Sequence, residues 1–254
     1  MQVTIIGAGN MGTVLGRLLL ANGDTVRQVY SRTPAHALLL AEELGAVAVS
    51  DTAMIDQEAD TYLLTITDDA LPAVAAKLSL GNKLVIHTAG SVSKQVLGNA
   101  STRYGVLWPV KMIRKNMHTI EPVTIVTDGN TEATMEVVEA FARRFSQAVT
   151  RADDATRAKM HMLAAVVSNF PNHLYRLAAD YCEQEQIDFR FLYPIIEETA
   201  RQVQGAHPAS VQAGPAFRGD TGTMEKHTAL LSGYPQLEAL YGAISRSILR
   251  SGGA

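Results

Sequence analysis

The apolar and polar positions in the first half of the chain alternate between short strand-like runs and helical stripes. The first run, Val3–Ile6, precedes a segment from Val14 to Ala21 whose apolar residues recur at helical spacing. Further strands are predicted at 25–30, 46–49, 59–67, 83–88, 104–110, 122–127 and 147–151, and helices at 34–44 and 131–145. Such alternation favours an α/β fold, a doubly wound and mostly parallel sheet, over residues 1–152.

The pattern changes at Ala152-Asp153-Asp154, after which only helical periodicity remains. We therefore predict a smaller all-α domain over residues 153–254. Its helices are expected at 155–184, 189–203, 223–231 and 235–249, followed by a frayed tail at 251–254. A domain boundary near residue 152 follows from this change of period.

The helix predicted at 155–184 has two distinct faces. One face is apolar and contains Leu163, Val166, Val167, Phe170, Leu174, Leu177 and Tyr181. The opposite face contains His161, Ser168, Asn172 and Tyr175, with Asn169 at its border. Few of these polar residues are charged, which favours the lining of a cleft; the alternative is an ordinary face toward water. Pro171 is expected to kink the helix and to release a backbone carbonyl near Val167.

A glycine-rich turn joins the first strand to the first helix. It reads Gly7-Ala8-Gly9-Asn10-Met11-Gly12, which is G-x-G-x-x-G in strand–turn–helix context. Gly7 permits the tight turn, Gly9 lets the backbone approach a pyrophosphate, and Gly12 lets the helix pack closely on the strand. The helix N-terminus then offers free N–H groups to phosphates. The sequence predicts a dinucleotide site, and a tight turn without a ligand is the alternative.

The end of the second strand favours NADP over NAD. An acidic residue at this position would bind the ribose 2′-hydroxyl of NAD. The chain instead has Ser31-Arg32-Thr33, and Asp24 lies at the wrong end of the strand. Arg32 offers a planar fork of donors to a 2′-phosphate, with the two hydroxyls beside it. Alternatively, Arg32 is a solvated surface residue and Thr33-Pro34 only caps the next helix.

Other polar residues follow later strands at the same edge of the predicted sheet, where ligands bind in open α/β folds. Thr67 and Asp68 come after the fourth strand, although Asp68 or Asp69 would also serve to cap a helix. His87 comes at the end of the fifth strand and is a candidate for contact with the nicotinamide ribose. A lone histidine is more often structural.

Composition and charge exclude several classes of protein. The net charge of −3, without a dense basic patch, gives no field for nucleic acid. The single cysteine, Cys182, excludes an internal disulfide framework and supplies no metal cluster, so we expect no metal and a reducing cytoplasm. Met1 is followed almost at once by a strand, which leaves no room for a signal peptide, and no apolar run reaches the ~18 residues of a membrane span.

The glycine turn followed by a helical half resembles the superfamily of pyrroline-5-carboxylate reductase, 3-hydroxyacid dehydrogenases and deazaflavin-dependent NADP reductases. More specific matches are His161, Ser168-Asn169-Phe170, Gly214-Pro215, Arg218-Gly219-Asp220 and His227. These are similar to a bacterial family of NADP oxidoreductases that joins a Rossmann-like domain to a helical domain of unassigned function. The resemblance covers essentially the whole chain and implies a homodimer formed through the helical half.

The chain departs from its relatives at two places. Where relatives carry a His-Pro pair after the sixth strand, this chain has Trp108-Pro109, with Lys111 nearby. The lysine–asparagine pair of the hydroxyacid dehydrogenases, four residues apart on a helix, is not reproduced by Lys159 and Asn169. Roles from those enzymes are therefore not transferred.

The leading hypothesis is an NADP-dependent oxidoreductase that acts on a small carbonyl or imine compound. His161 is the expected general acid/base, because an imidazole titrates near neutral pH. Ser168 and Asn169 would orient the small-molecule substrate. Lys111 and Arg218 would neutralise a substrate carboxylate, and Asp220 would position Arg218; the alternative for that loop is a structural turn with an internal Arg–Asp pair.

Two other functional hypotheses remain open. The chain could be a non-catalytic NADP(H)-binding module that reports redox state or regulates a partner. It could also be an isomerising or other enzyme that only uses the same fold, because fold does not fix function. The polar stripe around His161 favours the oxidoreductase, since a sensor would not need it.

Overall fold

The computed structural model describes residues 1–252, which divide into two compact units, 1–164 and 165–252. The sequence places the change of character at residue 152, and the last strand does end at Arg151. Helix α5 (Asp154–Ala164) nevertheless belongs to the first unit, because its side chains pack on β6 and β7.

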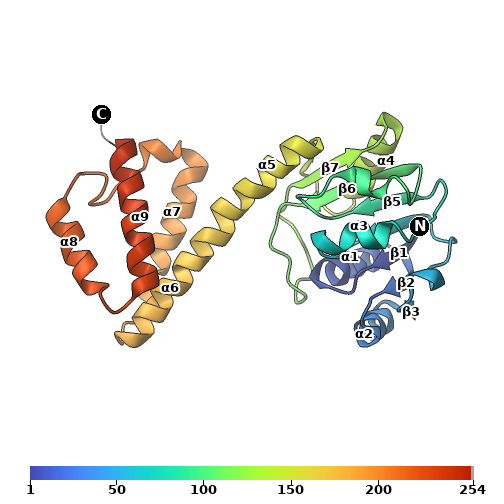
Figure 1. The fold of residues 1–254 in the computed structure, drawn as a ribbon, viewed down its shortest axis with the longest axis horizontal. Coiled ribbons are helices and arrows are strands. Elements are labelled where there is room, and N and C mark those ends of the chain that lie inside the picture. Colours follow the sequence, from blue (N-terminus) through green and yellow to red (C-terminus); the bar gives the residue numbers. More distant parts are fainter. Residues whose placement is uncertain (253–254) are drawn as a thin grey trace. The chain divides into compact units, whose positions relative to one another are not determined.

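The first unit is built on an eight-stranded sheet of order β3-β2-β1-β4-β5-β6-β7-β8 (Figure 1). Its strands are β1 (Gln2–Ile6), β2 (Thr25–Tyr30), β3 (Val47–Val49), β4 (Thr61–Leu64), β5 (Leu84–His87), β6 (Arg103–Pro109), β7 (Ile125–Gly129) and β8 (Val149–Arg151). All neighbours are parallel except β6 and β7. The doubly wound, mostly parallel α/β sheet predicted from the sequence is confirmed.

Helices cover both faces of this sheet because successive strand residues point to opposite sides. Ile5 packs with α1 (Asn10–Ala21), α2 (Pro34–Leu44) and α4 (Glu132–Ala142). Its neighbour Ile6 packs with the short helix α3 (Leu71–Ala75) on the other face. Farther along that second face, α5 covers Val106 and Trp108 of β6. The central strands are thus buried on both sides, as their continuous apolar runs predict.

The second unit is all helical within residues 165–252. It contains a π-helical turn (Ala165–Asn169), α6 (Phe170–Gln184), α7 (Tyr193–Gly205), α8 (Thr221–Leu230) and α9 (Pro235–Gly252), with short 3-10 turns at Phe189–Leu192 and Pro208–Ser210. None of the helices in residues 1–252 is long and apolar enough to cross a membrane.

Two local expectations are corrected by these boundaries. The helix predicted to start at Phe189 begins with a 3-10 turn and becomes α-helical only at Tyr193. The predicted frayed tail is helical through Gly252, and its last two residues, 253–254, lie outside the described residues. The expected irregularity before Pro171 is a π-turn that ends at Asn169, because a proline there cannot donate to the preceding turn.

Candidate functional site

A cavity of about 610 Å³ opens at the carboxyl ends of β1, β2 and β4. From β1 the strand order runs to β2 and β3 on one side and to β4 and β5 on the other, so the cavity lies at the switch point of the sheet. Open α/β sheets bind their ligands at this point. The lining comes from the glycine turn, the end of β2, the loop after β4, helices α2 and α3, and the β6–β7 connection: Gly7, Ala8, Gly9, Asn10, Tyr30, Ser31, Arg32, Thr33, His36, Thr65, Ile66, Thr67, Ala70, Val74 and Lys115.

The glycine turn has the conformation that its sequence predicts. Gly7 has φ of +126°, a region that L side chains rarely adopt. A Cβ at Gly12 would lie 2.0 Å from the carbonyl oxygen of Gly7, so only glycine lets α1 approach the turn. The hydroxyl of Thr65 fixes the same carbonyl with a hydrogen bond of 2.8 Å.

The start of α1 leaves room and donors for an anion. A Cβ at Gly9 would meet nothing within 4 Å, so the backbone is open on this side. The N-cap residue of α1 is Gly9, which has no side chain to cap the helix. The first N–H groups of a helix have no acceptor within the helix, so those of α1 are left for a ligand. Free amides at the positive end of a helix dipole suit a pyrophosphate.

The end of β2 presents donors without an acidic neighbour. Within residues 1–252, Arg32 makes no ion pair. The hydroxyl of Ser31 accepts a hydrogen bond of 3.2 Å from the Thr33 amide. Thr33 is the N-cap residue of α2, but its side chain makes no capping bond. Asp24 lies at the other end of β2, where it binds the N-terminus at 2.9 Å and Arg144.

Thr67 and Asp68 lie in the loop after β4. Thr67 lines the cavity and precedes a 3-10 turn, Asp68–Ala70, without capping it through its side chain. The carboxylate of Asp68 accepts a hydrogen bond from Ser91 and thereby joins the loops that follow β4 and β5. Its side chain therefore links two loops instead of capping the turn.

His87 is completely buried at the end of β5. Its Nδ1 accepts a hydrogen bond of 3.2 Å from the Ala89 amide, which assigns the ring proton to Nε2. Nε2 has no partner in the part of the chain that the structure describes. Burial, and after it the positive charge of Arg157, lower the pKa of His87 to about 4. The imidazole is therefore neutral at physiological pH.

The low pKa of His87 predicts a pH-dependent stability. An unfolded histidine takes up a proton near pH 6.5, whereas the folded protein resists protonation down to about pH 4, so acid favours unfolding across this window. Between about pH 8 and pH 5 we expect the wild type to lose about 2 kcal/mol more stability than His87→Gln. Urea unfolding at a series of pH values measures this; parallel pH profiles for both proteins would contradict it.

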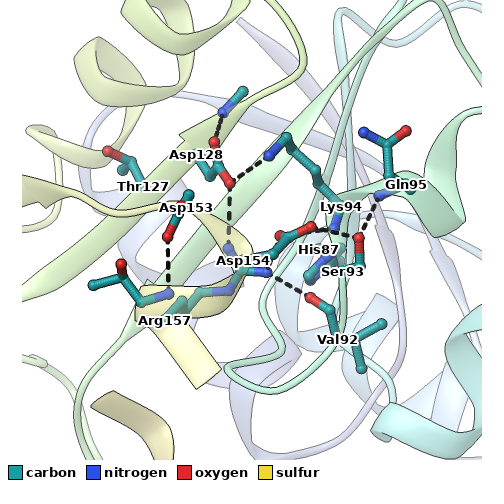
Figure 2. A network of polar contacts seen from close by, with 12 residues as sticks. His87, Val92, Ser93, Lys94, Gln95, Thr127, Asp128, Asp153, Asp154 and Arg157 are labelled. Carbon is teal, nitrogen blue, oxygen red and sulfur yellow. Dashed lines mark hydrogen bonds and ion pairs between the residues drawn. The ribbon is translucent and has the colours of Figure 1, made fainter. Parts of the chain in front are cut away.

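A buried ionic network lies beside His87 and was not predicted from the sequence (Figure 2). Arg157 of α5 is only 1% exposed. Its Nη2 donates to Asp154 Oδ1 and to the Val92 carbonyl oxygen, each at 2.6 Å, and its Nη1 lies 3.5 Å from Asp128 Oδ2. Lys94 Nζ donates to the same Asp128 oxygen at 2.7 Å. Two acids and two bases thus balance, which a buried site requires.

The network fixes the start of α5 to the loop after β5. The Ser93 hydroxyl and the Lys94 amide both donate to the carboxylate of Asp154. Burial acts to raise the pKa of Asp154, but the hydrogen bonds from Ser93 and Arg157 outweigh it, and the pKa lies below its usual value. Asp154 therefore remains ionised and holds the first turn of the helix in place.

His161 lies one helical turn beyond Arg157, on the same face of α5. Its ring is 5.5 Å from that of Trp108, centroid to centroid. A Cβ at Gly90 would lie 2.4 Å from His161 Cδ2 and 2.7 Å from Trp108 Cε2. The loop after β5 therefore needs glycine at this position to admit the imidazole. The structure brings His161 to the carboxyl ends of β5 and β6.

Of the remaining candidate residues, Lys111 belongs to the first unit and the others belong to the second. Lys111 Nζ donates to the Ile120 carbonyl at 2.9 Å, within its own loop. Ser168 and Asn169 belong to the π-turn of the second unit. Asp220 caps α8 by accepting from the amide and hydroxyl of Thr223, at 3.1 and 2.7 Å. Residues 1–252 show no ion pair between Asp220 and Arg218. The catalytic roles of these residues stay predictions.

Each half of the chain matches a known protein family or domain. Residues 2–90 match the family "NADP oxidoreductase coenzyme F420-dependent", and residues 123–248 match a domain of unknown function, DUF2520. None of the curated proteins compared with the chain matches it.

Solved structures give matches over the whole chain. A putative NADP oxidoreductase from Bacteroides fragilis is 31% identical, with 98% of each chain covered and a TM-score of 0.90. The 1-pyrroline-5-carboxylate reductase of Streptococcus pyogenes is 15% identical, with 98% of each chain covered and a TM-score of 0.64. A reductive aminase from Aspergillus terreus, in complex with NADPH and ethyl-5-oxohexanoate, is 20% identical, with 99% of this chain and 94% of that chain covered and a TM-score of 0.69.

Proposed function

This chain belongs to the family of the putative NADP oxidoreductase from Bacteroides fragilis, and from that premise we propose that it transfers hydride between NADP(H) and a small carbonyl or imine compound. It is an NADP-dependent oxidoreductase. The single observation that carries the proposal is the cavity at the switch point, which is lined both by the uncapped start of α1 and by Arg32, a residue without an ion pair in the described part of the chain.

The residues around the cavity fit the cofactor. The free amides of α1 and the open side of Gly9 would hold the pyrophosphate. Arg32, with Ser31 and Thr33, would hold the 2′-phosphate in a site that lacks the acidic residue of NAD enzymes. Thr67 and Asp68 would border the cofactor at the end of β4, and His87 lies at the end of β5. The bound nicotinamide supplies the hydride chemistry.

The substrate class rests on the relatives and on the acid/base group. The Aspergillus reductive aminase was solved with a keto ester, and the Streptococcus enzyme is named for a cyclic imine. Reduction of either group needs a proton for oxygen or nitrogen in addition to the hydride. His161, held against Gly90 and Trp108, is the residue we assign to that proton. Ser168, Asn169 and Arg218 would orient the substrate; Lys111 would do so only by leaving the Ile120 carbonyl.

The exposed apolar side chains of the second unit support a homodimer. Val167 is 72% exposed, Phe170 60% and Phe191 77%, and the first two belong to the apolar face predicted for this helix. Exposed aromatic and aliphatic side chains in such numbers are typical of a surface that another chain covers. We propose that two chains form a dimer through the helical unit. Sedimentation velocity measures the oligomeric state, and a monomer would contradict this proposal. We also place the protein in the cytoplasm, where the free thiol of Cys182 is stable.

Turnover of a substrate panel tests the function. Purified protein with NADPH is offered small ketones, aldehydes and cyclic imines, and NADPH oxidation is followed by absorbance. His161→Asn is expected to lower kcat about 100-fold or more while the affinity for NADPH stays within about twofold. Lys159→Met, a change at an exposed residue of the same helix, is the control and should retain activity. NADPH binding without turnover of any substrate would favour the non-catalytic sensor instead.

A further inference from the structure

The connection between β6 and β7, residues 110–124, lies against the start of α1. Asn10 Nδ2 donates to the Ile113 carbonyl at 3.1 Å. Arg17, farther along α1, donates to the carbonyl of Lys115 and to that of Met117, the latter at 3.4 Å. The side chains of Ile113 and Met117 pack on the core beneath α1. This connection therefore has a fixed course over the helix that carries the glycine turn.

This course places Lys115 among the residues that line the cofactor cavity. Lys115 lines the cavity of about 610 Å³ together with Arg32 and His36. It also lines an adjoining cavity of about 100 Å³, again with His36 and with residues of α2 such as Leu39. Arg32 and His36 lie four residues apart, between the end of β2 and the first turn of α2, whereas Lys115 belongs to the β6–β7 connection, so it is the fold that brings Lys115 to them.

None of these three side chains makes an ion pair or a side-chain hydrogen bond within residues 1–252. Arg17, which lines the same small cavity, is different because it pairs with Glu43. In the described part of the chain, no acidic residue lines the larger cavity, and Glu43, which lines the smaller one, is paired with Arg17. The positive charges of Arg32 and Lys115 therefore create a positive potential, which a bound anion would relieve.

We infer that Lys115 is a cofactor-binding residue that reaches over α1 to contact the 2′-phosphate of NADP and strengthens the choice of NADP over NAD. The inference rests on the cofactor assignment of the proposed function. The 2′-phosphate is favoured over the pyrophosphate because Lys115 shares both cavities with His36 of α2, the helix that follows Ser31-Arg32-Thr33. The pyrophosphate belongs at Gly9 and the first amides of α1.

Calorimetric titration of the full-length protein tests this contact with three probes: NADPH, NADH and adenosine 2′,5′-bisphosphate. Lys115→Met keeps the aliphatic stem and removes the charge. The substitution should lower the affinity for NADPH and for the bisphosphate about tenfold or more, while the affinity for NADH stays within about twofold. Lys115→Arg should retain most of the selectivity. Arg103→Met, at the amino end of β6 and thus at the opposite edge of the sheet, controls for net charge.

Equal losses for NADPH and NADH in Lys115→Met would overturn the inference, because the lysine would then contact a group that both cofactors share. NADPH affinity within about twofold of the wild type would overturn it as well. Failure of the wild-type protein to bind NADPH or the bisphosphate would instead overturn the cofactor assignment, and the inference with it. The two failures are therefore distinguishable from the wild-type titration alone.

Discussion

Replacing Arg157 by methionine is expected to lower the free energy of unfolding of the first unit by about 3–5 kcal/mol, because the change removes a buried cation that contacts the buried Asp128 and the half-buried Asp154. Arg157 is 1% exposed and contacts both Asp154 and Asp128. The ammonium group of Lys94 would still neutralise Asp128. Asp154 would keep only neutral donors, namely the Ser93 hydroxyl and the backbone amide of Lys94. The largest part of the loss therefore comes from Asp154.

Tryptophan fluorescence during urea unfolding measures this change, since Trp108 is the single tryptophan of the chain and packs near α5. The matched control is Arg143→Met, which removes an exposed arginine paired with Glu139 on one helix and should cost less than about 1 kcal/mol. The double variant Arg157→Met with Asp154→Asn should recover part of the loss. Equal costs for the Arg157 and Arg143 variants would show that the network contributes no more than a surface pair.

Two alanine substitutions in the glycine turn are expected to separate folding from cofactor binding. Gly12→Ala places a Cβ 2.0 Å from the Gly7 carbonyl, so α1 must shift. We expect a loss of about 1–3 kcal/mol in stability and an NADPH affinity lowered about 100-fold or more, since the amides of α1 move with the helix. Gly9→Ala introduces its methyl group into open space, at a φ of −84° that any residue adopts.

Gly9→Ala should therefore fold at least as stably as the wild type, because alanine has less conformational freedom to lose. Its NADPH affinity should nevertheless fall about tenfold or more, since the methyl group occupies the space into which the pyrophosphate would fit. Calorimetry with NADPH and urea unfolding of the same samples measure both quantities. Undiminished NADPH binding by Gly9→Ala would show that the pyrophosphate does not approach this residue.

Much of the first unit was predictable because its signals are local. The apolar runs of β1, β2 and β4 and the stripe of α1 depend only on the spacing of neighbouring residues, and strands buried on both faces are continuously apolar. The glycine turn was predictable for the same reason: the requirement for φ of +126° at Gly7 and for close approach at Gly12 leaves glycine as the residue that fits. Arg32 could be predicted as a ligand of the 2′-phosphate because the end of the second strand is a position that sequence reveals.

Tertiary structure decided which distant residues meet. Nothing in the spacing of Lys94, Asp128, Asp154 and Arg157 indicates a common buried network, because the pairing of charges depends on strand order and on the packing of α5. Lys115 lines the cavity beside Arg32 because the β6–β7 connection lies over α1, where it is bonded to Asn10 and Arg17. The sequence by itself determined the helices and strands of the first unit and the glycine turn, because these depend on local periodicity and backbone conformation. Long-range packing decided which partners the charged side chains meet.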